Sequence, residues 1–289
     1  MLNLWNPSHL SLSVGLITAF ILGMIHGITP DEHTWPITFS YSIGSYSSKK
    51  GMLSGLVFST GFTLQRAIAS ELAFMALTGF LMSSSSENIV YIIVGIVMAI
   101  SGYYILHKGR SFHLIPWLEK LLPQTDDSKP VPIRLAFLHG IIAGCGTGAF
   151  ATIIYTVISP TMPSVWVGFV PGLLFGLGTL SMQVIIGALF GWWIQSRNIS
   201  QSSKANIGQF VSGNTLQYGG LLFMLAGILG LIDPSISDWG VNTGIRVHNL
   251  DSINIGVILV VIIVAGIGGV SMWLALRKNK ENTLGTHNG

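Results

Sequence analysis

Charged residues are scarce in this 289-residue chain: Asp, Glu, Lys and Arg together make up 9% of it, whereas 50% is hydrophobic. A soluble domain usually carries about a quarter charged residues, because its surface has to stay hydrated. A chain this apolar cannot cover a water-facing surface with polar groups, which excludes an ordinary soluble domain. The composition therefore predicts an integral membrane protein whose main solvent is lipid.

Cysteine is nearly absent as well, since Cys145 is the only one in the sequence. A single thiol excludes an internal disulfide framework and a relay that passes electrons between paired thiols. The Gly-rich ATP-binding loop and the His-Glu-x-x-His pattern of zinc peptidases are also missing. We therefore expect neither an ATP-driven pump nor another enzyme, and no permanently bound cofactor.

Basic residues are few, with 14 Lys and Arg and a formal net charge of +3. They lie mostly in short connections, which is a membrane-orientation signal rather than a nucleic-acid surface. If the N-terminus lies outside the cell, all of these basic residues except Arg66 and Arg246 fall on the cytoplasmic side of the membrane. The positive-inside rule thus predicts a multi-pass plasma-membrane protein with an external N-terminus and a cytoplasmic C-terminus.

Long apolar stretches are abundant, and a helix needs ~20 mainly apolar residues to cross a bilayer. The first stretch contains Pro30 and Pro36, each of which removes a backbone donor, so we expect a broken helix there. Its beginning lacks a basic segment and a clear cleavage site, so we expect it to be retained as the first span. The predicted spans are about 10–46, 51–82, 89–107, 134–158, 165–194, 215–232 and 253–276.

The first six spans read as two copies of one three-helix unit. Both copies contain two apolar residues followed by His-Gly-Ile, so that His26 matches His139, and a similar later segment ends in Gln65 or Gln183. Three spans per copy make the copies antiparallel, which is the architecture of many secondary transporters. We predict one all-α membrane domain over 1–289, with repeat one at about 10–107, repeat two at about 134–232, an extra helix at 253–276 and a tail at 277–289.

The polar run His26-Gly-Ile-Thr-Pro-Asp31-Glu32-His33 is the most informative feature of the chain. Ionised groups near the middle of a bilayer are costly unless they are paired or coordinated. Imidazole together with carboxylate suits nickel, cobalt, zinc or manganese, so His26, Asp31 and His33 are candidate metal ligands, with His139 as a candidate fourth. The alternative is that these groups pair with one another, shaping a kink or relaying protons.

His26-x4-Asp31-x-His33 resembles the His-x4-Asp-His signature of the nickel/cobalt transporter families, including the efflux-type and urease-accessory-like membrane proteins. His26 and Asp31 fall on the family's first His and its Asp, whereas Glu32 displaces the final His by one position. The Gly-rich sequence after His139 resembles the half-repeats of the sulfite-exporter (TauE-like) families of the LysE-type superfamily. The resemblance implies small-ion transport on a 3+3 fold, with Ni²⁺ or Co²⁺ as cargo.

Further polar residues are candidates for the pathway or for coupling. Arg66 could pair with an acid of the first span or act as the counter-charge of an anionic cargo. The two glutamines could line the pathway, or they could only join helices. Cys145 could be a soft metal ligand, although a lone thiol also serves as a small packing residue. The full set is Glu32, Gln65, Arg66, Glu71, Gln183 and Cys145.

Three functions stay open on the sequence. The first is a secondary transporter of a divalent transition-metal cation, with nickel or cobalt favoured. The second is an exporter of a small anion such as sulfite on the same fold. The third is a haem-binding electron-transfer protein with His26 and His139 as axial ligands, although Asp31 and Glu32 crowd that turn. The expected partners are the lipid bilayer and a small ion; homo-oligomers stay open, and nucleic acid is not expected.

Overall fold

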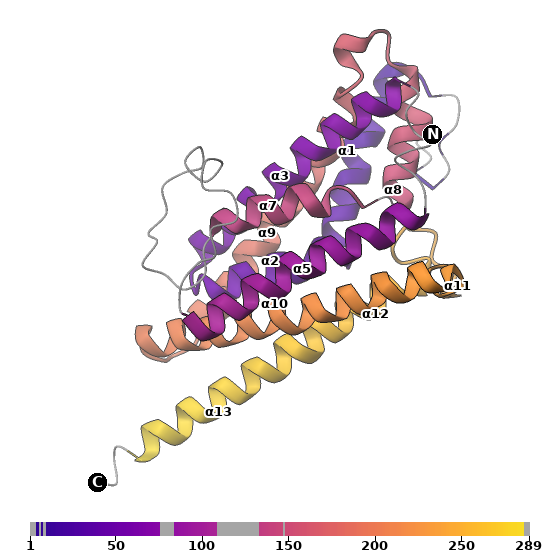
Figure 1. The fold of residues 1–289 in the computed structure, drawn as a ribbon. Coiled ribbons are helices and arrows are strands. Elements are labelled where there is room, and N and C mark those ends of the chain that lie inside the picture. Colours follow the sequence, from indigo (N-terminus) through magenta and orange to yellow (C-terminus); the bar gives the residue numbers. More distant parts are fainter. Residues whose placement is uncertain are drawn as a thin grey trace.

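The computed structural model describes residues 4–5, 7, 10–75, 84–108, 133–146 and 148–285, and it is mostly helical (Figure 1). The long helices lie side by side, and α13 diverges from the others toward the C-terminus. In chain order the elements are α1 Leu12–Ile28, α2 Trp35–Gly44, α3 Ser48–Phe74, α5 Ser84–Lys108, α7 Ile133–Ala143, α8 Ala149–Thr152, η1 Ile153–Ile158, η2 Ser159–Thr161, η3 Val165–Val167, α9 Val170–Gln195, α10 Gln201–Ile232, α11 Pro234–Ser237, β1 Gly240–Asn242, β2 Ser252–Asn254, α12 Ile255–Val260, η4 Val261–Gly268 and α13 Gly269–Gly285.

Within the described residues, four helical stretches are long and apolar enough to cross a membrane, as in a membrane-embedded protein. They coincide with the third, fifth, sixth and seventh predicted spans, so the structure does not reproduce the count of seven. The first and fourth predicted spans are each divided into short pieces, and α3 carries four charged side chains in its 27 residues. The four stretches are Glu87–His107, Val165–Gln195, Gln201–Ile232 and Ile255–Glu281.

The first predicted span is a broken helix, as its prolines predict. α1 ends at Ile28, Thr29 is extended with ψ of 147°, and α2 begins at Trp35. Pro36 occupies the first turn of α2, where a missing N–H costs no hydrogen bond. A second break, which the sequence did not predict, separates α7 from α8 and contains Gly144, Gly146 and Gly148.

Glycines bring helix backbones into direct contact across the bundle. A Cβ atom added to Gly23 of α1 would clash with the carbonyl oxygen of Phe175 in α9, and one added to Gly140 of α7 would clash with that of Phe58 in α3. Gly51 of α3 faces α9 in the same way, against the Gly187 carbonyl oxygen. Small residues allow such close packing in lipid, where apolar burial gives little drive for association.

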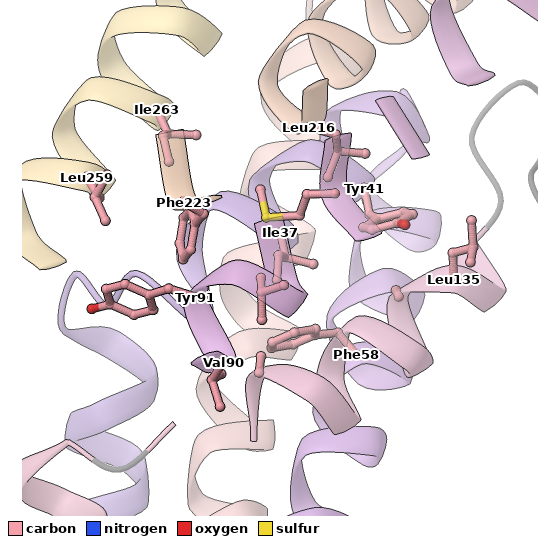
Figure 2. Close-up of a cluster of buried hydrophobic side chains, with 14 of the residues drawn as sticks. Ile37, Tyr41, Phe58, Val90, Tyr91, Leu135, Leu216, Phe223, Leu259 and Ile263 are labelled. Carbon is pink, nitrogen blue, oxygen red and sulfur yellow. The ribbon is translucent and has the colours of Figure 1, made fainter. Parts of the chain in front are cut away.

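A large apolar cluster joins α2, α3, α5, α7 and α10 to α12 and η4 near the C-terminus (Figure 2). Tyr91 and Tyr41 lie on opposite sides of it in this view. Each hydroxyl bonds a polar partner: Tyr91 donates to Glu32 Oε1 at 2.9 Å, and Tyr41 Oη is 3.1 Å from His139 Nδ1. Buried apolar side chains therefore separate two polar places in the bundle.

Basic residues gather at one end of the bundle. The backbone N–H of Ser48 bonds Gln195 Oε1, and Lys204 Nζ bonds the carbonyl oxygen of Gln195, so the ends of α3, α9 and α10 meet. A crevice at this end is lined by residues of both α10 and α13. The basic side chains placed here are Lys49, Lys50, Arg197, Lys204, Arg277, Lys278 and Lys280. Basic residues also predict a cytoplasmic loop at 108–133, of which residues 109–132 lie outside the described residues.

The connection at 233–252 is not a plain loop. It contains α11 and a two-stranded antiparallel sheet, in which Gly240 pairs with Asn254 and Asn242 pairs with Ser252. We refer to residues 240–254 as the hairpin. Its last residue, Asn254, accepts a hydrogen bond from the N–H of Val257 at 3.0 Å and so caps α12. The all-α prediction therefore holds apart from this small sheet.

Candidate ion-binding site

A cavity of about 260 Å³ lies where the two helix breaks, α3, α5 and the hairpin come together. His26, Asp31, His33 and Arg66 line it, and each is only 4% exposed. Asn249 of the hairpin lines the same cavity. The polar run of the first predicted span thus faces a cavity that is lined largely by polar residues and reaches exposed residues of α11 and the second break.

Asp31, Glu32 and His33 form the centre of this site. The backbone N–H of His33 donates to Asp31 Oδ1 at 3.0 Å, which fixes the turn between α1 and α2. His33 Nδ1 lies 3.4 Å from Glu32 Oε1 and 4.0 Å from Asp31 Oδ1. One ligand atom from each of the three residues can be chosen so that all lie within 4.8 Å of one another, a spacing that one metal ion can bridge. Two carboxylates and an imidazole form a donor set suited to a divalent transition metal.

His26 approaches the same centre from the last turn of α1. Its Nδ1 lies 3.5 Å from Asp31 Oδ2, and its ring packs among Phe62, Phe150 and Phe175 at centroid distances of 5.5, 5.4 and 5.2 Å. Among the described residues neither ring nitrogen of His26 makes a hydrogen bond. Buried polar atoms are seldom left without a partner, so these nitrogens are available to a ligand.

Glu32, which the family signature does not contain, belongs to the site. The Tyr91 hydroxyl holds its Oε1, and Gly256 of α12 lies against its carboxylate, where an added Cβ would meet Oε2. The side chain is therefore fixed from α5 and from α12. Its position beside His33 makes it a candidate ligand.

Arg66 reaches the cavity from α3. Its Nη1 donates to the carbonyl oxygen of Gly146 at 2.7 Å and to the Tyr155 hydroxyl at 3.0 Å, and its guanidinium lies 4.7 Å from the Phe62 ring centroid. Across the described part of the chain, no ion pair links Arg66 to an acid of the first break. Glu71 lies apart, beside Gly168, and does not line the cavity.

His139 does not complete the ion site. It is fully buried beside Tyr41, does not line the cavity, and its Nδ1 is 2.9 Å from the Leu135 carbonyl oxygen. A carbonyl only accepts, so Nδ1 carries the proton and Nε2 is an unprotonated nitrogen without a partner in the described structure. The predicted fourth ligand thus belongs to a separate buried pair.

The two glutamines and the cysteine lie outside the cavity lining. Gln183 donates to the Gly27 carbonyl oxygen at 2.9 Å and accepts from the Thr38 hydroxyl at 2.6 Å, so it connects the two pieces of the broken helix. Gln65 lies against Gly144 in the second break. Cys145 lies in the second break and is exposed, with its thiol 3.6 Å from the carbonyl oxygen of Ile141 in the last turn of α7. Gln183 therefore joins the pieces of the first break, and none of the three residues lines the cavity.

The sequence reasoning missed several residues of the site. Tyr91, Tyr155 and Asn249 all lie outside the polar run and the repeated motifs, so no local signal in the sequence marks them. Comparisons with protein-family models, curated proteins and solved structures find no match to this chain. The functional argument therefore rests on the geometry of the site.

Proposed function

We propose that the protein is a secondary transporter of a divalent transition-metal cation, with Ni²⁺ or Co²⁺ as the favoured cargo. The observation that carries the proposal is the buried group of His26, Asp31, Glu32 and His33 around one cavity. Nitrogens of both histidines lack hydrogen-bond partners there among the described residues. Such a set of few ligands can hold a dication and still release it.

The charges of the site support a cation. Arg66, whose Nη1 already bonds Gly146 and Tyr155, is the one guanidinium among the lining residues. Five carboxyl groups line the same cavity: those of Asp31, Glu32, Glu87, Asp238 and Asp251. Acidic side chains therefore outnumber the one guanidinium in the cavity lining. Binding a cation therefore offsets the cost of the buried carboxylates.

An inverted 3+3 repeat is part of the proposal. The first broken helix packs on α9, and the second, α7 with α8, begins by packing on α3. Exchanging the halves converts the α1–α9 contact into the α7–α3 contact, and in each contact a glycine of one half lies against a carbonyl oxygen of the other half. Broken helices that meet at a site between repeats are typical of secondary transporters.

The anion alternative has one observation in its favour. Arg66 lines the cavity, and its Nε has no hydrogen-bond partner in the described residues, so it could meet an anion such as sulfite. Asp31 and Glu32 would then repel the cargo, and for this reason we place the cation first. The haem alternative has no support, because His139 does not line the cavity.

The proposal is tested by transport in proteoliposomes against a panel of Ni²⁺, Co²⁺, Zn²⁺ and sulfite. Asp31→Asn keeps the shape but removes the charge, and hydrogen bonds and pairs with charged groups typically contribute ~1.5–3 kcal/mol, so metal flux should fall about tenfold or more. The exposed Asp233, outside the cavity, provides the matched control Asp233→Asn, which should transport as the parent does. The proposal would be contradicted if Asp31→Asn transported the metals as well as the parent does. It would also be contradicted if Asp31→Asn lost sulfite transport instead of metal transport.

A further inference from the structure

The hairpin contacts the ion site through one side chain. Asn249 Nδ2 donates to Asp31 Oδ2 at 3.2 Å. The preceding residue, His248, is stacked on Trp5 with ring centroids 4.5 Å apart, and its Nε2 lies 3.0 Å from the Trp5 carbonyl oxygen. His248 also meets the Phe150 ring, which packs on His26. The hairpin tip is thus held directly over the site.

The backbone of the hairpin is shaped to direct the amide at Asp31. Asn249 has a φ of 66°, in the left-handed region that asparagine tolerates better than most residues with a side chain. The N–H of Thr243 donates to the Asp251 carbonyl oxygen at 2.9 Å, and its hydroxyl donates to that of Leu250. These bonds close the turn on both sides of Asn249, so its side chain has a fixed direction.

The amide of Asn249 and a metal ion need the same oxygen. Asp31 Oδ1 already accepts the backbone N–H of His33, and Oδ2 accepts Asn249. A dication on Oδ2 would face the N–H hydrogens of the amide, which carry partial positive charge. Binding of a cation at Oδ2 therefore opposes the Asn249 hydrogen bond, and each weakens the other.

We propose that Asn249 is a latch residue: it competes with the cation for Asp31 and keeps the hairpin closed over the empty site. Arrival of a divalent cation at Asp31 releases the amide and lets the hairpin open at this end of the bundle. The ligand class rests on the proposed function, whereas the latch contact itself can be tested without any metal.

The test uses the full chain in lipid nanodiscs, with Cys145→Ala and a reporter cysteine at Ala151, which lines the cavity and is only 2% exposed. Reaction of the reporter with a small neutral methanethiosulfonate measures how often the cavity opens. Asn249→Gly keeps the left-handed backbone and removes the amide, and Asn249→Asp keeps the shape but repels Asp31. Both variants should react about tenfold faster than the parent, because a tenfold change corresponds to the free energy that a hydrogen bond to a charged group typically contributes. The control is Val241→Ala, at a hairpin residue that is 54% exposed and does not line the cavity; this variant should react as the parent does.

A second measurement is Ni²⁺ binding by calorimetry. Removal of the competitor should make Asn249→Gly bind Ni²⁺ more tightly than the parent, by about tenfold. Parent-like reaction rates in both variants, or in Asn249→Asp if Asn249→Gly does not fold, overturn the latch. Weaker Ni²⁺ binding in Asn249→Gly also overturns it, because Asn249 would then be a ligand. Faster labelling in a protein whose parent binds no Ni²⁺ supports the latch and contradicts the cation function, so the two failures are distinguishable.

Discussion

Gly146 lies against the imidazole of His33: a Cβ atom added to Gly146 would be 2.6 Å from His33 Nε2. The two residues come from different helix breaks, so the backbone of the second break forms one wall of the ion site. The carbonyl oxygen of the same glycine accepts the hydrogen bond of Arg66 Nη1 at 2.7 Å. One residue without a side chain thus positions both an imidazole and a guanidinium.

Gly146→Ala is expected to displace the His33 ring. Ni²⁺ binding should then weaken about tenfold, because the contact between the His33 imidazole and the ion is lost. Calorimetric titration of the purified variant measures the change. Gly148→Ala is the matched control, since a Cβ atom there meets nothing within 4 Å. Equal Ni²⁺ affinity in the two variants would show that the His33 position does not matter.

Tyr91→Phe removes the hydroxyl that donates to Glu32 Oε1 at 2.9 Å. The carboxylate then loses a partner in a buried place, so the free energy of unfolding should drop by about 1.5–3 kcal/mol. Thermal unfolding in detergent measures this loss. Tyr103→Phe on the same helix is the control, because Tyr103 is 45% exposed and should give no comparable loss.

Gln183→Leu leaves the Gly27 carbonyl oxygen and the Thr38 hydroxyl without their partner at the first break. Each unsatisfied buried group costs about 1–3 kcal/mol, so a marked drop in melting temperature is expected. Gln65→Leu should be milder, because the Gln65 amide oxygen has no hydrogen-bond partner in the described residues. A larger loss in Gln65→Leu would reverse the roles that we assign to the two glutamines.

The asymmetry of basic residues predicts which end of the bundle faces the cytoplasm. In a Cys145→Ala background, Val241→Cys in the hairpin should react with an impermeant thiol reagent on intact cells. Asn198→Cys, exposed between α9 and α10, should react only after the cells are opened. The reverse pattern would invert the predicted orientation.

Local sequence signals predicted the first break and the centre of the site. Pro30 and Pro36 act on the backbone next to them, and Asp31, Glu32 and His33 are consecutive, so one turn is enough to bring them together. Composition likewise predicted four of the membrane helices, because a run of apolar residues is itself the signal.

The remaining parts of the site depend on long-range packing that periodicity does not encode. Asn249 is 218 positions from Asp31 along the chain, and only the path of the hairpin brings them into contact. His139 matches His26 in sequence, yet the Tyr41 hydroxyl and the Leu135 carbonyl oxygen hold it elsewhere. The second break was missed because glycines interrupt a helix less visibly than prolines do.

The contact between α3 and α9 determines which parts of the molecule can move. Gly51 and Gly187 leave no room between the two backbones, and Gly172 and Gly176 continue the contact along α9 against Arg66 and Thr63. Sliding these helices past each other would drive carbonyl oxygens into Cα atoms. We therefore expect α3 and α9 to move together as one rigid unit that joins the two halves of the chain. A transport cycle in which the two halves rock as separate bodies would have to break the contact between α3 and α9. Under the proposed transport function, alternating exposure of the ion would fall to the parts around this pair: the two helix breaks, the hairpin and the C-terminal segment from α12 to α13.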